Sequence, residues 1–249
     1  MSIRRSLRRL FGRPSLAAPR DATPPRPDFF DFDPFRRNDR PELRDAPLAA
    51  LHYVVFDTET TGLYAARGDA VVSIGAVRAV GAHIRAAETF DRLVNPRRKI
   101  PPASTRIHGI DDAMVREAPA MEAVLPAFRD FAGDAVLVAH NAAFDLNFLA
   151  QHETATGVRL SNPVLDTMFL ADLLYGKAGD HSLDALAKRF GVELAARHSA
   201  LGDALATAEV FVRLLDGLAA RGIATFGEAS DAARMMPNLR SATARFARA

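Results

Sequence analysis

Two carboxylates stand two residues apart, directly after an apolar run. Residues 51–56 (LHYVVF) are rich in β-forming types and lead into DTETTGL, which carries Asp57 and Glu59. Because strand side chains alternate, these two carboxylates lie on one face about 7 Å apart. They repel each other unless a cation neutralises them, and a hard divalent cation prefers carboxylate oxygen. The pair indicates a divalent metal site, although a solvated strand edge can carry the same pattern.

A third carboxylate, Asp145, follows a short apolar run. Residues 135–139 predict a buried strand, and His140 and Asn141 then open the helix in whose first turn Asp145 lies. Ligand sites often form at such strand-to-helix junctions, and the helix dipole favours an ionised carboxylate there. An ordinary helix start capped by Asn141 would have the same sequence.

The fourth carboxylate, Asp203, opens the last long helix and follows His198 by five residues. We expect His198 on the preceding loop, free to swing over a site that includes Asp203. Small residues at positions 200, 202, 204 and 208 allow this helix to approach its neighbours closely. A plain helix N-terminus with an exposed His is the alternative.

The elements that must position these residues predict an α/β fold. The predicted strands cover residues 51–56, 71–80, 84–94, 135–139 and 164–166. The predicted helices cover residues 102–107, 111–117, 120–132, 142–152, 167–175, 183–190 and 202–218. Three successive strands predict an antiparallel meander. Helices and strands that then alternate predict a mixed five-stranded sheet flanked by helices.

Together the motifs resemble the DEDDh family of 3′–5′ exonucleases, which carries Asp, Glu, Asp and Asp in this order with a His five residues before the last Asp. The matching residues here are Asp57, Glu59, Asp145, His198 and Asp203. The segments RIHGI (106–110), LDT (165–167) and HSLDAL (181–186) are similar to the epsilon-type proofreading exonucleases of bacterial DNA polymerase III. The resemblance covers residues 50–218 and implies an RNase-H-like exonuclease fold with all four carboxylates in one cluster.

The resemblance also implies a chemistry: two-metal hydrolysis of phosphodiester bonds from the 3′ end of single-stranded or frayed DNA, releasing nucleoside 5′-monophosphates. Asp57, Glu59 and Asp203 would hold one Mg²⁺, for which Mn²⁺ can substitute. Asp57 would bridge to a second ion that Asp145 contacts directly or through water. His198 would act as general base, since an imidazole with an ordinary pKa of about 6.5 suits that role at neutral pH.

The family further implies residues that bind the terminal nucleotide. They correspond here to Thr60, Leu63, His108, Asn141 and Phe144. One position departs from the pattern: epsilon-type enzymes commonly carry an acidic residue five positions before the H-G-I histidine, where this chain has Ala103. We therefore expect recognition of the terminal hydroxyl to use another group.

The composition agrees with a site made of oxygen ligands. The 249 residues include no Cys, which excludes disulfides, thiolate metal sites and cysteine nucleophiles. A hydrophobic share of 49% suits a globular core. No apolar run is long enough for a membrane span, and the resemblance implies a cytoplasmic protein of bacterial type.

Charge is unevenly spread along the chain. The formal net charge is +2, yet residues 1–20 hold six Arg and no acidic residue. We expect residues 1–49 to form a basic tail and Pro-rich linker, largely disordered, residues 50–218 the exonuclease domain, and residues 219–249 a partly helical extension. The tail is a candidate docking element for a polymerase or other protein partner, a nucleic acid or a membrane surface.

Several functional alternatives stay open. The substrate can be RNA or short oligonucleotides in place of DNA 3′ ends, or the chain can be a non-catalytic module that binds nucleic acid or a partner. The sequence contains no Q-x-x-L-x-F-like clamp-binding segment. That absence favours a stand-alone or differently tethered relative of the replicative proofreader.

Overall fold

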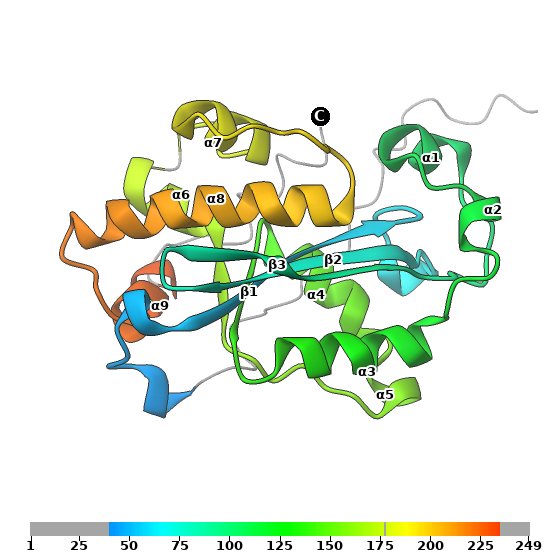
Figure 1. Ribbon diagram of the computed structural model, residues 1–249, viewed down its shortest axis with the longest axis horizontal. Helices are drawn as coiled ribbons and strands as arrows, with labels where there is room; N and C mark the ends of the chain where they lie inside the picture. Colours follow the sequence, from blue (N-terminus) through cyan, green and yellow to red (C-terminus); the bar gives the residue numbers. More distant parts are fainter. Residues whose placement is uncertain (1–39, 177, 235–249) are drawn as a thin grey trace, which may run out of the picture.

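A five-stranded sheet forms the centre of the protein (Figure 1). The computed structural model describes residues 40–176 and 178–234, and the predicted tail up to residue 39 and the end of the extension lie outside this part. The strands are β1 (His52–Thr60), β2 (Val71–Val80), β3 (His83–Leu93), β4 (Val136–Ala139) and β5 (Val164–Asp166). Their order is β3-β2-β1-β4-β5. β2 is antiparallel to β1 and β3, and β4 is parallel to β1 and β5, which confirms the predicted meander and mixed sheet.

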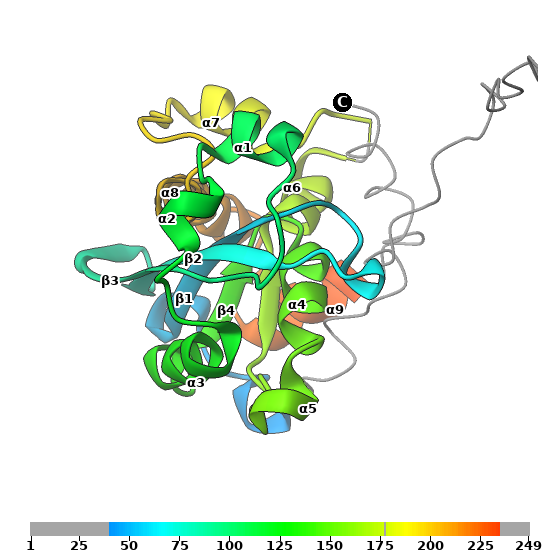
Figure 2. The same cartoon turned by 90° about the vertical axis from the view of Figure 1, so that its right-hand side faces the viewer.

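Helices cover both faces of this sheet, as the two views in Figures 1 and 2 show. They are α1 (Pro102–His108), α2 (Asp112–Val115), α3 (Met121–Ala132), α4 (Ala142–Ala150), α5 (Glu153–Thr156), α6 (Thr167–Tyr175), α7 (Leu183–Phe190), α8 (Ala200–Ala219) and α9 (Phe226–Arg234). Helices α3 and α4 contribute to the hydrophobic core on one face, and α6 to α9 contribute to the core on the other. The short helices α1 and α2 lie past one end of the sheet.

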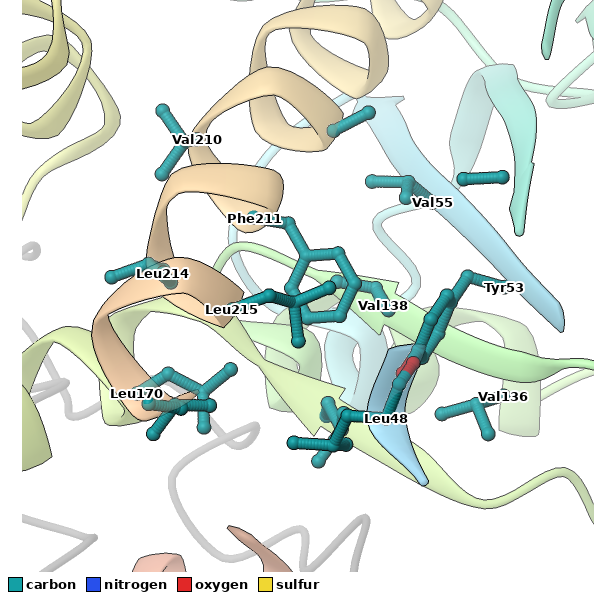
Figure 3. Close-up of a cluster of buried hydrophobic side chains, with 14 of the residues drawn as sticks. Leu48, Tyr53, Val55, Val136, Val138, Leu170, Val210, Phe211, Leu214 and Leu215 are labelled. Atoms are coloured by element: carbon teal, nitrogen blue, oxygen red, sulfur yellow. The ribbon is translucent and has the colours of Figure 1, made fainter. Parts of the chain in front are cut away.

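Alternation along β1 explains why both faces of the sheet are apolar. Tyr53 and Val55 point into the core under α8, whereas Val54 and Phe56 point into the core under α3. In the first core, the Tyr53 ring meets Phe211 of α8 edge-on, with 4.8 Å between ring centroids (Figure 3). The Tyr53 hydroxyl is buried but satisfied, because it donates to the Leu48 carbonyl at 2.7 Å. The strand is thereby fixed on both sides at its N-terminal half.

Two elements are longer than their patterns predict. β1 does not end at Asp57 but continues to Thr60, because residues 57–60 keep pairing with β2 as far as Val71. Helix α8 begins at Ala200, two residues earlier than predicted, because the Ser199 hydroxyl caps it by accepting the Gly202 N–H at 3.2 Å. The extension of β1 carries Asp57 and Glu59 on strand backbone, and the earlier start of α8 places Asp203 in a capped first turn.

The segments that flank the predicted exonuclease domain pack against each other. The Leu48 N–H donates to the Ala224 carbonyl at 2.8 Å, and the Phe226 N–H donates to the Ala46 carbonyl at 3.0 Å. Arg44 and Asp231 add an ion pair across the same junction. Short 3₁₀ turns, η2 (Pro41–Leu43) and η3 (Leu48–Ala50), lead from there into β1, and η4 (Ala65–Arg67) follows β1. Within the described residues, no helix is long and apolar enough to cross a membrane.

Candidate active site

Three of the four predicted carboxylates meet at the C-terminal half of β1. Asp57, Glu59 and Asp203 each offer an oxygen, and these oxygens all lie within 4.8 Å of one another. Asp57 and Glu59 are half-buried and share one face of β1, while Asp203 is buried in the first turn of α8. Residues 146 positions apart in the chain therefore form one acidic group, which we call the acidic triplet.

A glycine on β2 allows α8 to reach β1. Gly75 pairs with Asp57 across the sheet. A methyl group at Gly75 would lie 2.0 Å from the backbone nitrogen of Leu201, far inside van der Waals contact. The first turn of α8 thus rests directly on the backbone of β2 beside Asp57, and this close approach brings Asp203 into the acidic triplet.

Asp145 borders the triplet and is held by the neighbouring residue of β1. Its Oδ1 accepts the Thr58 backbone N–H at 2.9 Å and the Thr58 hydroxyl at 2.6 Å. Asp145 is buried, and its charge is among the main causes that raise the pKa of Asp57. The structure therefore brings all four predicted carboxylates together, with Asp145 on the side of Thr58.

The loop before α4 is shaped by a further buried acid, Asp166. Its carboxylate accepts the N–H groups of Asn141 at 3.1 Å, Ala142 at 2.8 Å and Met168 at 2.9 Å. These bonds hold Asn141 in a left-handed conformation, with φ of 67°. Asn141 is the residue before α4, but its side chain makes no capping bond, so the simple capping interpretation is wrong. Asp166 instead fixes the direction in which α4 presents Asp145.

His198 lies on the loop before α8, as predicted, and its backbone is bonded to Asp203. The His198 N–H donates to Asp203 Oδ2 at 3.2 Å, and His198 adopts a left-handed φ of 63°. A non-glycine residue in this region is uncommon and is held only by surrounding contacts. The hydrogen bond to Asp203 therefore fixes the backbone of this loop beside the acidic triplet at His198.

Burial and mutual repulsion raise the pKa values of the acids in the metal-free protein. Burial first, then the neighbouring acids, raise the pKa of Glu59 to about 8 and that of Asp57 well above its usual range. Burial raises the pKa of Asp145 to about 7 against the hydrogen bonds from Thr58. Burial also raises the pKa of Asp203, and the Arg197 guanidinium opposes it.

The residues fit a divalent cation. Asp203 Oδ1 is buried and has no hydrogen-bond partner in the described part of the chain. An orphaned buried carboxylate oxygen is costly unless a ligand satisfies it. A hard cation bound to the triplet would satisfy this oxygen and remove the repulsion among the acids.

The predicted nucleotide-binding residues belong to segments that adjoin these acids or the His198 loop. Leu63, just beyond β1, leaves 44% of its surface exposed, although it is a large apolar side chain. His108 ends α1, and both burial and the nearby His198 lower its pKa, so the two imidazoles share one site. A hydrogen bond to the Thr60 backbone opposes this lowering of the His108 pKa. Asn141 Oδ1 is buried and lacks a partner among the described residues.

The other two members of this set are positioned by local contacts. Thr60 is buried, and its hydroxyl donates to the Gly62 carbonyl at 2.7 Å. Phe144, one residue before Asp145, is half-buried and packs 5.0 Å from the Phe148 ring. Ala103 is exposed on α1 and carries no polar group, so nothing at that position replaces the acidic residue of the epsilon-type pattern.

Sequence reasoning missed several residues that shape the site: Thr58, Gly75, Asp166 and Arg197. Asp166 lay in a segment already noted for its similarity to epsilon-type enzymes, so its importance had a sequence signal. Gly75 and Arg197 had none, since each acts through a contact with a distant element.

Comparison with known proteins identifies the family. The family model RNase_T, described as Exonuclease, matches residues 54–211, a span that includes all four carboxylates and His198. The chain belongs to this exonuclease family. Membership confirms the DEDDh-type resemblance and the expected nuclease class of enzyme, and it implies use of a divalent metal.

Two relatives are longer proteins that contain a segment similar to this chain. The DNA polymerase III subunit epsilon-like protein of Rhodobacter capsulatus is 54% identical over 200 residues, which are 80% of this chain and 28% of that protein. The DNA polymerase III PolC-type protein of Caldanaerobacter subterraneus is 44% identical over 176 residues, 71% of this chain and 12% of that protein. The chain thus spans less than a third of the length of these relatives.

Solved structures agree on the fold. Exonuclease X in complex with 5′ overhanging duplex DNA has a TM-score of 0.59 at 29% identity, covering 73% of this chain and 99% of that one. Exonuclease I has a TM-score of 0.58 at 18% identity, covering 69% of this chain and 44% of that one, and shows the fold alone. The predicted RNase-H-like exonuclease fold is confirmed.

Proposed function

We propose that this protein is a metal-dependent 3′–5′ exonuclease that shortens DNA from its 3′ end and releases nucleoside 5′-monophosphates. The observation that carries the proposal is the acidic triplet, bordered by Asp145 and by the His198 loop. A structural role does not require carboxylates from β1 and α8 to crowd together at raised pKa. Metal-assisted hydrolysis of a phosphodiester uses such a group to hold its cations.

In this proposal, Asp57, Glu59 and Asp203 would hold one divalent cation, Mg²⁺ or Mn²⁺. Asp57 would help hold a second, which Asp145 would contact directly or through water. When bound, the ions would neutralise the phosphate and stabilise the charge that develops on the attacking and leaving oxygens. Thr58 keeps Asp145 turned toward Asp57 by its two bonds to Oδ1. The raised pKa values mean that cation binding displaces protons from these acids.

His198 is proposed as the general base that accepts a proton from the attacking water. Its position supports this role, because its own N–H is bonded to Asp203 and its ring belongs to the adjoining loop. Thr60, Leu63, His108, Asn141 and Phe144 are proposed to bind the terminal nucleotide. The unsatisfied Asn141 Oδ1 is available to polar atoms of that nucleotide.

DNA is proposed as the substrate because the relatives above are named for DNA polymerase III and Exonuclease X was solved with DNA. RNA or short oligonucleotides remain the competing substrates. A polymerase is the proposed protein partner, with the N-terminal tail as its attachment. Capture of a purified polymerase catalytic subunit by the full chain, but not by a chain starting at residue 40, would test that partnership.

The activity is tested with 5′-labelled single-stranded DNA, RNA and dinucleotides in Mg²⁺, Mn²⁺ or EDTA. We expect a metal-dependent ladder on DNA that shortens from the 3′ end. Asp203→Asn should reduce turnover by at least about a hundredfold, since it removes a charged ligand from the cluster. Asp216→Asn is the matched control, because Asp216 is an exposed acid farther along the same helix. Binding of DNA without cleavage, or full activity of folded Asp203→Asn, would contradict the proposal.

A further inference from the structure

Arg197 places a positive charge on the acidic triplet. It immediately precedes His198 on the loop between α7 and α8, and its guanidinium is bonded to Asp203 Oδ2. The other edge of the same group is bonded to Asp184 of α7, with Nη2 2.9 Å from Oδ2 and Nε 3.1 Å from Oδ1. The Arg197 side chain is only 26% exposed, so its planar guanidinium bridges the carboxylates of Asp184 and Asp203 where much of the solvent is excluded.

The charge reaches beyond the direct partner. Arg197 also acts electrostatically on Asp57 and Glu59, where it favours the ionised carboxylates against burial. In the metal-free protein, Arg197 therefore does part of what a bound cation would do for the triplet. It satisfies Oδ2 of Asp203 but leaves Oδ1 buried and without a partner in the described residues.

The same guanidinium also touches the proposed base. Nη1 of Arg197 lies 3.4 Å from Nδ1 of His198. A guanidinium can only donate, so Nδ1 must accept, and the neutral ring then carries its proton on Nε2. One side chain thus engages a carboxylate of the triplet and the ring lone pair of the residue next to it.

We propose that Arg197 is an internal counter-cation that competes with the divalent metal for Asp203, with Asp184 holding it in place. This inference rests on the proposed function, because it assumes that the triplet binds metal. A cation at the triplet and the guanidinium on Asp203 carry like charge within a few ångströms of each other, so each weakens the binding of the other. The coupling is reciprocal: bound metal weakens the Arg197–Asp203 contact by the same factor as the formed contact weakens metal binding, so removing the contact should tighten metal binding.

The alternative role for Arg197 has the opposite sign. If Arg197 only orients Asp203 for the metal, its removal loosens the ligand and weakens metal binding. Competition and orientation are therefore separated by the direction of the change in metal affinity, with no need for an activity measurement.

The test is a Mn²⁺ titration of the full chain by isothermal calorimetry, together with melting temperatures in EDTA and in saturating Mn²⁺. Arg197→Gln should lower the Mn²⁺ dissociation constant by about three- to tenfold, the range expected for loss of a partly buried ionic contact. Arg197→Lys keeps the charge but lacks the planar guanidinium that bridges two carboxylates. Its Mn²⁺ dissociation constant should lie between those of the wild type and Arg197→Gln. The melting temperature in EDTA should fall for Arg197→Gln, so the rise caused by Mn²⁺ should be larger than in the wild type.

Arg189→Gln is the matched control, because it removes the same charge from α7, where the guanidinium lies over the Tyr175 ring at 4.3 Å. Its Mn²⁺ affinity should stay within about twofold of the wild type. Equal or weaker Mn²⁺ binding by folded Arg197→Gln, with wild-type binding intact, would overturn the competition and leave the metal site standing. Binding by Arg197→Gln alone would support competition, whereas no binding by any variant would overturn the proposed function together with this inference.

Discussion

Each carboxylate of the site has a different set of partners. Asp145 accepts two bonds from Thr58, Asp203 accepts the His198 N–H and the Arg197 guanidinium, and Asp57 and Glu59 face mainly other acids. Their proposed roles as metal ligands can therefore be tested separately, by changing the partner of one acid and leaving the acid itself in place.

The shifted pKa values predict how the stability of the metal-free protein depends on pH. The folded-state pKa is raised to about 8 for Glu59 and about 7 for Asp145, above unfolded values of about 4. A raised folded pKa gives stability that is fully present below about pH 4 and is lost as the pH rises through the folded value. In EDTA the melting temperature should therefore fall between pH 5 and pH 9, by about 3–6 °C after allowance for solvent screening.

Scanning calorimetry in EDTA and in saturating Mn²⁺ would measure this effect. Mn²⁺ binds the ionised acids of the folded state, so it should raise the melting temperature most at the alkaline end. Glu59→Gln removes the group with a pKa of about 8 and should flatten the EDTA profile above pH 7. A flat profile for the wild type in EDTA would mean that the acids are not forced together as described.

The hydroxyl of Thr58 offers a second residue-scale prediction. Thr58→Val keeps the backbone N–H and the side-chain shape but deletes the hydroxyl bonded to Asp145 at 2.6 Å. Loss of this bond to a buried carboxylate should cost about 1–2 kcal/mol and lower turnover by about tenfold. Thr89→Val, at an exposed threonine of β3, is the matched control and should leave turnover unchanged. Equal turnover of the two variants would show that the bond from the Thr58 hydroxyl to Asp145 does not contribute to activity.

At the scale of elements, the site depends on how closely α8 meets the sheet. Gly75→Ala places a methyl group 2.0 Å from the backbone of Leu201, and that backbone cannot yield as a side-chain tip can. We expect a loss of about 2–3 kcal/mol of stability and a much smaller rise in melting temperature with Mn²⁺, because Asp203 moves away from Asp57.

The control for this prediction is the same substitution within α8 itself. A methyl group at Gly217 meets only the end of the flexible Leu174 side chain, at 2.9 Å. Gly217→Ala should therefore be near neutral in stability and retain the full Mn²⁺ effect. If Gly75→Ala also retains the full rise in melting temperature with Mn²⁺, the close contact of α8 with β2 at Gly75 does not assemble the acidic triplet.

The contrast between Asp57 and Gly75 shows what sequence can and cannot predict. The carboxylates were singled out from alternation along one strand and from their place at two helix starts, which are local patterns, and the resemblance to the DEDDh family predicted that they form one site. Gly75 matters because Leu201, 126 positions away, packs on it, and no local pattern reports such a contact. The same holds for Arg197, whose partner Asp184 belongs to another helix.

The strands and helices themselves were predicted well, because their apolar residues follow the periods of the two structures. The end of β1 was misplaced because the polar run at residues 57–60 looks like a loop, whereas its pairing with β2 makes it a strand. Tertiary pairing overrode local polarity there.

On the scale of the molecule, positive charge is concentrated near the start of the sequence and negative charge at the site. The net charge of +2 combines an Arg-rich start with a mildly acidic remainder, and four of those acids meet at the site. A bound divalent cation would offset this local negative charge, which otherwise repels phosphate. Binding of nucleic acid at the site should therefore require metal. Any attraction of phosphate to the Arg-rich tail should not.

The pairing of residues 44–48 with residues 224–227 bears on how the fold can be joined to other chains. These two segments of the described part of the chain meet beside the start of β1, while the acidic triplet lies at the far half of a nine-residue strand, roughly 20 Å away. A fold whose entry and exit points are neighbours can be spliced into a host protein, or circularly permuted, with only short connections. Either arrangement would leave the acidic triplet at the opposite end of β1 from the new connections, so the domain can be joined to different proteins without a change at the triplet.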